Sequence, residues 1–223
     1  MLFDYASKSW SPTAPRTLAG KPERIDACNV ILPTGEIFVC GGTNGAGGGK
    51  PDTNGVQDGE LFKPDAGAGS WVTLPKAQIV RNYHSVALLM PDGRVWTAGS
   101  NKNSARSFDP AGSDNRELRV ELFEPDYFSA PNRPAIDQAP GHVPCAMWFD
   151  IKSPQAASIT KVVMIRNGSV THAFNGDQRL IELEFKHKDA NTLRALSPPN
   201  NNIAPPGDYM IFILAGNIPS VGK

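Results

Sequence analysis

The sequence predicts an all-β protein in which two copies of a multi-stranded repeat precede a sandwich of short strands. Its 223 residues include 21 glycines and 20 prolines, spread so that few stretches are long enough for a helix. One segment repeats itself after about 58 residues, and the repetition stops after about residue 134. These observations argue against helical bundles and doubly wound folds, and favour many short strands joined by turns.

The repeat is clearest where residues 27–44 lie over residues 85–102. Each copy predicts an apolar strand, a Pro-Thr-Gly or Pro-Asp-Gly turn, a second apolar strand, a loop and a third strand at Glu60–Asp65 or Glu121–Asp126. Leu2–Asp4 resembles the tail of an earlier copy. Strands that are apolar on both faces must be covered on both sides, as in stacked propeller blades. Residues 1–130 are therefore predicted to form about two blades of a partial kelch-type β-propeller.

The remaining residues, 131–223, have a different character. Strands are predicted at Val162–Ile165, along the alternating Ile181, Leu183 and Phe185, and at Tyr209–Leu214. Asn-Gly, Pro-Pro and Pro-Gly turns separate them. About 90 residues of short strands with such turns predict an immunoglobulin-like sandwich.

The charge balance and the N-terminus exclude several classes of partner. The 22 basic and 22 acidic residues cancel, so the chain lacks the positive surface that nucleic acids and anionic membranes attract. No apolar run reaches the roughly 18 residues that span a bilayer, and the first ten residues do not form a signal peptide. We therefore expect neither nucleic acid nor a membrane as a partner.

Cysteines and glycines give no cofactor signal by themselves. The three cysteines, Cys28, Cys40 and Cys145, have no CxxC spacing, which favours buried thiols over a disulfide framework or a zinc site. The glycine-rich segment Gly41–Lys50 is predicted to be a loop between strands, because Lys50 precedes a proline where a phosphate-binding loop has serine or threonine.

Two of the four histidines lie in strand-like segments. These are His84 and His172, whereas His142 lies among prolines and His187 between lysines, as expected of surface residues. A lone histidine is more often a hydrogen-bonded structural residue than a metal ligand. A metal-binding role therefore needs a more specific signal than spacing.

The residues around these histidines supply that signal. The segment VRNYHSVALLMPDGRVWTAGS, Val80–Ser100, resembles the part of galactose oxidase and glyoxal oxidase that carries an axial tyrosine and an adjacent histidine on copper. Lys161–Phe185 is similar to the region that provides the third metal histidine. Arg119–Ile136 resembles the link into that family's C-terminal domain, and Ala204–Lys223 resembles its closing segment. The chain is identified as the C-terminal portion of this family, with the last kelch blades and the early-set domain.

The resemblance implies a set of site residues. Tyr83, His84 and His172 would hold one copper ion, and Tyr83 would be the base that takes the substrate hydroxyl proton. Imidazole nitrogens and phenolate oxygens suit copper(II). Neighbours in a regular strand point to opposite faces, so Tyr83 and His84 reach one ion only if the backbone turns at the strand entrance. Arg24 aligns with a substrate-contacting arginine, and a surface or inter-blade role for it is an equal alternative.

The resemblance also implies an activity. Family members oxidise a primary alcohol or an aldehyde, in some cases a carbohydrate, with O2 to give H2O2, and they act outside the cell. Their second electron is held by a tyrosine cross-linked to cysteine in earlier blades, and this radical cofactor is not encoded in the chain. Both ends look cut, and a missing N-terminal propeller portion would be a partner. We therefore expect weak or no metal binding and no turnover from the chain alone.

Two other functions stay open at this point. The family's aromatic-histidine pair after the arginine is Asp26-Ala27 here, and the radical pair is missing. Both departures favour a non-catalytic module whose kelch loops and immunoglobulin-like domain bind glycan or protein. The third alternative is a truncated gene product without an independent role.

Overall fold

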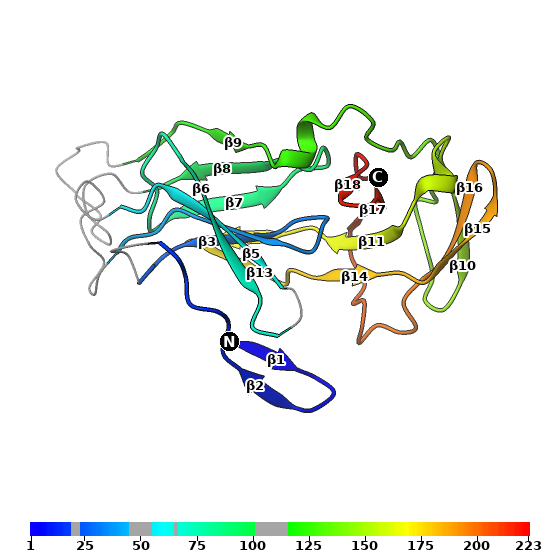
Figure 1. Ribbon diagram of the computed structural model, residues 1–223, viewed down its shortest axis with the longest axis horizontal. Helices are drawn as coiled ribbons and strands as arrows, with labels where there is room; N and C mark the ends of the chain where they lie inside the picture. Colours follow the sequence, from blue (N-terminus) through cyan, green and yellow to red (C-terminus); the bar gives the residue numbers. More distant parts are fainter. Residues whose placement is uncertain (19–22, 45–54, 65–66, 101–115) are drawn as a thin grey trace. The chain divides into compact units, whose positions relative to one another are not determined.

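The computed structural model describes residues 1–18, 23–44, 55–64, 67–100 and 116–223, which are built almost entirely from antiparallel β-strands (Figure 1). Its helices are two short 3-10 turns, η1 (Asp126–Ser129) and η2 (Ala156–Ser158). The chain forms two compact units. The first unit comprises residues 1–88, 96–122 and 170–176, and the second comprises 89–95, 123–169 and 177–223. The predicted all-β class is confirmed.

The first copy of the repeat is a four-stranded sheet in the first unit. Its strands follow one another in the order β3 (Cys28–Ile31), β4 (Ile37–Cys40), β5 (Asp58–Lys63) and β6 (Ser70–Lys76). The sheet has one strand more than the repeat predicted, because the segment after β5 turns back and pairs with it. The glycine-rich segment predicted to be a loop, Gly41–Lys50, lies outside the described residues from residue 45 onward.

The second copy repeats this meander with three strands, β7 (Ser85–Leu89), β8 (Val95–Gly99) and β9 (Glu121–Phe123). The connecting turns match in detail. Gly35 donates its N–H to Leu32 O in the first copy, and Gly93 donates to Met90 O in the second, both at 2.9 Å. The sequence repeat is therefore a structural repeat.

A third, shorter copy is present near the start of the chain. The hairpin of β1 (Leu2–Asp4) and β2 (Ser9–Ser11) pairs Phe3 with Trp10, as β5 and β6 pair Phe62 with Trp71. In both pairs the ring centroids lie 5.0 Å apart at an interplanar angle of 48°. The likeness of Leu2–Asp4 to the tail of a repeat is thus confirmed by its pairing.

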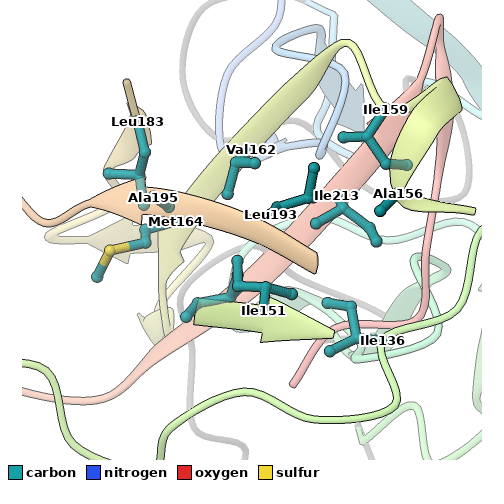
Figure 2. Close-up of a cluster of buried hydrophobic side chains, with 11 residues drawn as sticks. Ile136, Ile151, Ala156, Ile159, Val162, Met164, Leu183, Leu193, Ala195 and Ile213 are labelled. Carbon is teal, nitrogen blue, oxygen red and sulfur yellow. The ribbon is translucent and has the colours of Figure 1, made fainter. Parts of the chain in front are cut away.

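The second unit is a sandwich of two antiparallel sheets. One sheet has the order β10 (Trp148–Lys152), β16 (Thr192–Leu196) and β15 (Phe185–Asp189). The other has the order β14 (Leu180–Glu182), β11 (Lys161–Arg166), β17 (Tyr209–Ala215) and β18 (Ile218–Pro219). Side chains from both sheets form the core in Figure 2, which includes Ile151, Val162, Leu193 and Ile213. The predicted sandwich is confirmed.

The alternating residues Ile181, Leu183 and Phe185 do not lie in one strand as predicted. Ile181 is in β14 and Phe185 begins β15, so the chain crosses from one sheet to the other between them. Leu183 keeps its N–H bonded to Val162 O at 2.8 Å, and its side chain is buried in the core. Alternation persists through the crossing because every second residue still faces the space between the sheets.

The described residues contain no helix long and apolar enough to cross a membrane. The cysteines are free, and their environments differ. Cys28 is buried directly opposite Cys40 across the β3–β4 pair, as expected of apolar thiols. Cys145 is exposed, with its Sγ 3.2 Å from Asn201 Oδ1, so the prediction of a buried thiol is wrong there. The proline-rich segment that carries it belongs to the second unit and is largely exposed to solvent.

These environments predict selective thiol chemistry. Burial raises the pKa of the Cys40 thiol to about 12, and burial also raises the pKa of Cys28. The thiolate is the reactive form, so a maleimide at neutral pH should label Cys145 and leave the other two thiols largely unmodified. Peptide mass spectrometry locates the label, and unfolding in urea should expose all three thiols. Fast labelling of Cys28 in the folded protein would contradict this assignment.

Candidate metal centre

Tyr83 and His84 are the two central residues of a turn that leads into β7. Ser85 donates its N–H to Asn82 O at 3.0 Å, which closes the turn around them. His84 has a φ of 68°, a left-handed conformation that is uncommon for a residue other than glycine. The backbone therefore turns at the strand entrance. This turn is the condition that was predicted for the Tyr83 and His84 side chains to reach one ion.

His172 lies in a second tight turn of the first unit, between β12 (Ser169–Thr171) and β13 (Phe174–Gly176). His172 and Ala173 both have positive φ, 53° and 65°. Two-residue hairpin turns with two positive φ angles match the natural twist of the strands. Ala173 then donates its N–H to Ser85 O at 2.8 Å, which ties this hairpin to the start of β7.

The two turns bring three rings together from positions up to 89 residues apart in the chain. The ring centroids of Tyr83 and His84 are 4.1 Å apart, those of His84 and His172 are 4.7 Å apart, and those of Tyr83 and His172 are 5.6 Å apart. Tyr83 is half-buried, whereas both histidines are exposed. We call Tyr83, His84 and His172 the ring cluster.

The donor set of the ring cluster fits copper(II). It offers imidazole nitrogens and a phenol oxygen, the ligand types that copper(II) prefers, and the exposed histidines leave it open to an ion from solvent. Within the described residues, no three or more side chains of His, Cys, Asp or Glu group together as a metal site. A metal at this place would therefore depend on the tyrosine as its third protein ligand.

Thr171 fixes one nitrogen of His172. The distance from Thr171 Oγ1 to His172 Nδ1 is 2.5 Å. A hydrogen bond at Nδ1 sets the orientation of the ring and makes Nε2 the nitrogen that would coordinate a metal. This role of Thr171 was not predicted from the sequence, although a threonine next to a candidate ligand histidine could have suggested it.

Gly99, at the end of β8, makes room for the Tyr83–His84 turn. It has a φ of 71°, and a Cβ at this position would lie 2.6 Å from His84 O. Gly99→Ala should therefore destabilise the protein by about 2 kcal/mol or more, because it combines backbone strain with a steric clash. Gly35→Ala is the matched control, since Gly35 has a φ of 91° and open space around it, and about 1 kcal/mol is expected. Equal shifts of the two urea midpoints would contradict the clash.

Arg24 lies inside the first copy of the repeat and makes polar contacts there. Its side chain is 3 % exposed, and it contacts Glu60 Oε2 through Nη1 at 2.5 Å. Its Nε donates to Gly41 O at 2.6 Å, and its Nη2 donates to Asp58 O at 2.9 Å. These contacts hold the guanidinium against strand ends of its own sheet.

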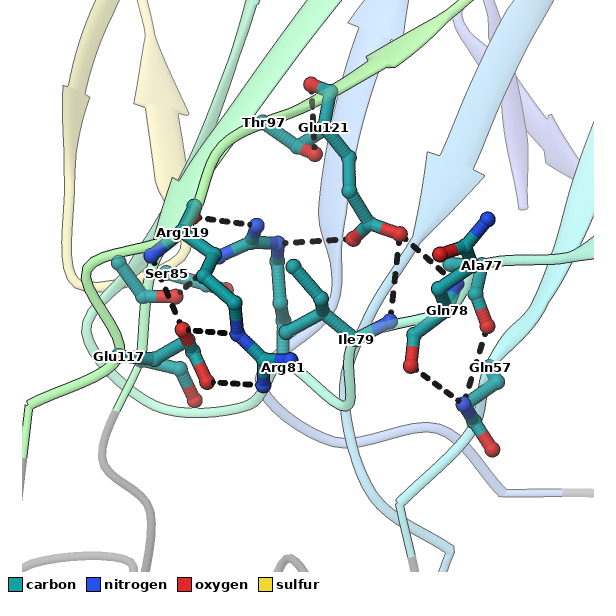
Figure 3. Close-up of polar contacts among 12 residues, drawn as sticks. Gln57, Ala77, Gln78, Ile79, Arg81, Ser85, Thr97, Glu117, Arg119 and Glu121 are labelled. Atoms are coloured by element: carbon teal, nitrogen blue, oxygen red, sulfur yellow. Dashed lines mark hydrogen bonds and ion pairs between the residues drawn. The ribbon is translucent and has the colours of Figure 1, made fainter.

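Arg81 makes equivalent contacts in the second copy. Its Nη1 donates to Gly99 O at 2.7 Å. Figure 3 shows its contacts with Glu121, whose Oε2 lies 3.4 Å from Nε, and with Arg119 O, which accepts from Nη2 at 2.7 Å. Gly99 and Glu121 are the repeat equivalents of Gly41 and Glu60. An arginine that recurs with the same partners in both copies has a structural role within its own sheet, and its role as a substrate contact stays a prediction.

Comparisons with known proteins agree with this architecture. The family model "Glyoxal oxidase N-terminus" matches residues 20–127, and "Galactose oxidase-like, Early set domain" matches residues 133–223. The chain belongs to the galactose oxidase and glyoxal oxidase family. The predicted domain boundary at residue 130 lies between the two matches.

Relatives of the chain include proteins that are named as oxidases. The chain is 33 % identical to "Aldehyde oxidase GLOX" of Vitis pseudoreticulata, over 90 % of this chain and 40 % of the relative. It is 30 % identical to a galactose oxidase of Gibberella zeae, over 87 % of this chain and 28 % of the relative. A solved fungal alcohol oxidase in complex with copper superposes with a TM-score of 0.78 at 29 % identity, covering 92 % of this chain and 42 % of that one. The chain thus spans about two-fifths or less of these proteins.

Proposed function

We propose that this chain carries copper ligands of an oxidase that converts a primary alcohol or an aldehyde, with O2, to the oxidised product and H2O2. The observation that carries the proposal is the ring cluster, in which two imidazoles and a phenol gather from distant segments of a chain of this family. In the reaction the alcohol, or the hydrate that the aldehyde forms with water, loses two electrons and two protons, and O2 takes up both to become H2O2. Copper, when bound, supplies a one-electron acceptor and favours the phenolate form of a tyrosine ligand.

Each residue of the ring cluster has a proposed role. His84 and His172 would hold the metal through their imidazole nitrogens, and Thr171 keeps the His172 ring oriented. Tyr83 takes the proton of the substrate hydroxyl at its phenolic oxygen. The half-buried Tyr83 ring lies beside two exposed histidines, which a small alcohol or carbohydrate can approach from solvent. The proposed second electron store, a tyrosine cross-linked to cysteine, belongs to other blades, so we propose turnover only for the whole protein. By resemblance that protein is extracellular.

Copper titration of the chain tests the proposal. From the sequence, the missing blades predict weak or no metal binding. Because the ring cluster forms within the first unit, we propose instead one saturable Cu(II) site per chain, with nitrogen hyperfine structure in the EPR spectrum and a phenolate-to-copper absorption that Tyr83→Phe removes. Peroxide assays with primary alcohols, sugars and aldehydes should show no turnover from the chain alone. Copper that binds only non-stoichiometrically, or with a spectrum indifferent to Tyr83→Phe, would overturn the assignment.

A further inference from the structure

A reciprocal pair of hydrogen bonds anchors the residue just before the Tyr83–His84 turn. Asn82 donates its backbone N–H to Ser100 Oγ at 2.9 Å, and the Ser100 hydroxyl donates to Asn82 Oδ1 at 2.8 Å. Both residues are buried, Asn82 fully. The carbonyl of Asn82 accepts the N–H of Ser85, which closes the turn. The Ser100 hydroxyl therefore holds the residue on which the turn is built.

The backbone of Ser100 indicates that this hydroxyl has a specific role. Ser100 has a φ of 139°, a region that favours glycine. Its repeat equivalent, 58 residues earlier, is Gly42 with a φ of 86°. The two positions make the same backbone contact, since Val56 N–H donates to Gly42 O at 2.9 Å and Glu117 N–H donates to Ser100 O at 3.0 Å. The second copy therefore has Ser100 at a position where the backbone favours glycine, and the first copy has Gly42 there.

The segment between the arginine and the turn proline is one residue longer in the second copy than in the first. Arg24 precedes Pro33 by nine residues, whereas the equivalent Arg81 precedes Pro91 by ten. The longer segment contains Asn82, whose buried Nδ2 has no hydrogen-bond partner among the described residues. A buried amide with an unsatisfied donor is costly. An asparagine at position 82 is explained if the hydrogen bond that its Oδ1 accepts from Ser100 is needed to shape the turn.

We infer that Asn82 and Ser100 are a positioning pair that holds the Tyr83–His84 turn so that both rings face His172. The expected effect on copper binding rests on the proposed function. The positioning role itself rests on the hydrogen bonds within the chain. Neither residue touches the ring cluster through the contacts described above. They act through the backbone of the turn.

Ser100→Gly tests the inference with little risk to folding, because glycine suits the backbone at this position and removes only the hydroxyl. In the metal-free protein we expect the Ser85 amide to exchange its hydrogen about tenfold faster. Nuclear Overhauser contacts between the His84 and His172 rings should weaken. In Cu(II) titrations the affinity should fall on the order of tenfold, as for other residues that orient metal ligands.

Asn82→Ala removes only the Oδ1 acceptor and keeps the backbone N–H that donates to Ser100 Oγ, so its effect should be smaller than that of Ser100→Gly. The double variant should behave like Ser100→Gly alone, because that change already breaks both hydrogen bonds. Ser197→Ala is the control, a buried serine of the second unit whose loss should leave the ring contacts and the Ser85 exchange unchanged. If Ser100→Gly leaves both metal-free measurements at wild-type values, or if the two single effects add, the positioning pair is refuted. Absence of copper binding in the wild type would refute the proposed function and leave the metal-free test intact.

Discussion

Glu60→Gln should destabilise the first unit by about 3–5 kcal/mol, the cost of leaving buried cations without their counter-charge. The Glu60 side chain is fully buried in β5, and its carboxylate pairs with both Arg24 and Arg16, whose side chains are 3 % and 18 % exposed. A glutamine would keep one acceptor oxygen, but its amide hydrogens would face guanidinium donors. Two arginines would then repel each other in a poorly solvated site.

Equilibrium urea unfolding, followed by tryptophan fluorescence, measures this effect. Glu121→Gln is the matched control, because Glu121 is the repeat equivalent of Glu60 but its side chain is 20 % exposed. Its Oε1 accepts the backbone N–H groups of Gln78 and Ile79, and a glutamine oxygen can still do so. We expect a loss of about 1 kcal/mol there. Equal losses for the two variants would show that burial does not set the strength of these ion pairs.

His172→Ala should lower the affinity of the chain for Cu(II) by at least about 100-fold, beyond the 10–100-fold range seen when a residue that only orients a ligand is changed. The variant removes one of two imidazoles and leaves His84 and the Tyr83 phenol, which is a poor site for copper(II). His172 is exposed at the tip of a hairpin, so its loss should not affect the fold. Competition with a chelator of known affinity gives the dissociation constants.

His187→Ala is the control for the loss of a histidine from the surface. His187 is exposed in β15, and its ring meets the Phe185 ring in a T-shaped contact within the second unit. Its removal should leave copper affinity and the EPR spectrum unchanged. A His172→Ala protein that binds copper as tightly as the wild type, with the same spectrum, would exclude His172 as a ligand.

Much of the fold follows from local sequence. Gly35 and Gly93 have positive φ and mark tight turns, and the strand segments before and after these turns are apolar, so the hairpins of both copies could be predicted. The strand β6 was not predicted, because it exists only by pairing with β5. The crossing at Leu183 was missed for a related reason, since alternation reports which residues face the core and not which sheet they join.

The sequence by itself determined the all-β class, the repeat, the family and the identity of Tyr83, His84 and His172 as candidate ligands. It did so because strand patterns, turn residues and family motifs are local properties of the chain. Only the tertiary structure decided that the three rings meet, that Arg24 is buried against Glu60, and that Ser100 holds Asn82. These contacts join residues 18 to 89 positions apart, so they depend on strand pairing and turn geometry that a local pattern does not encode.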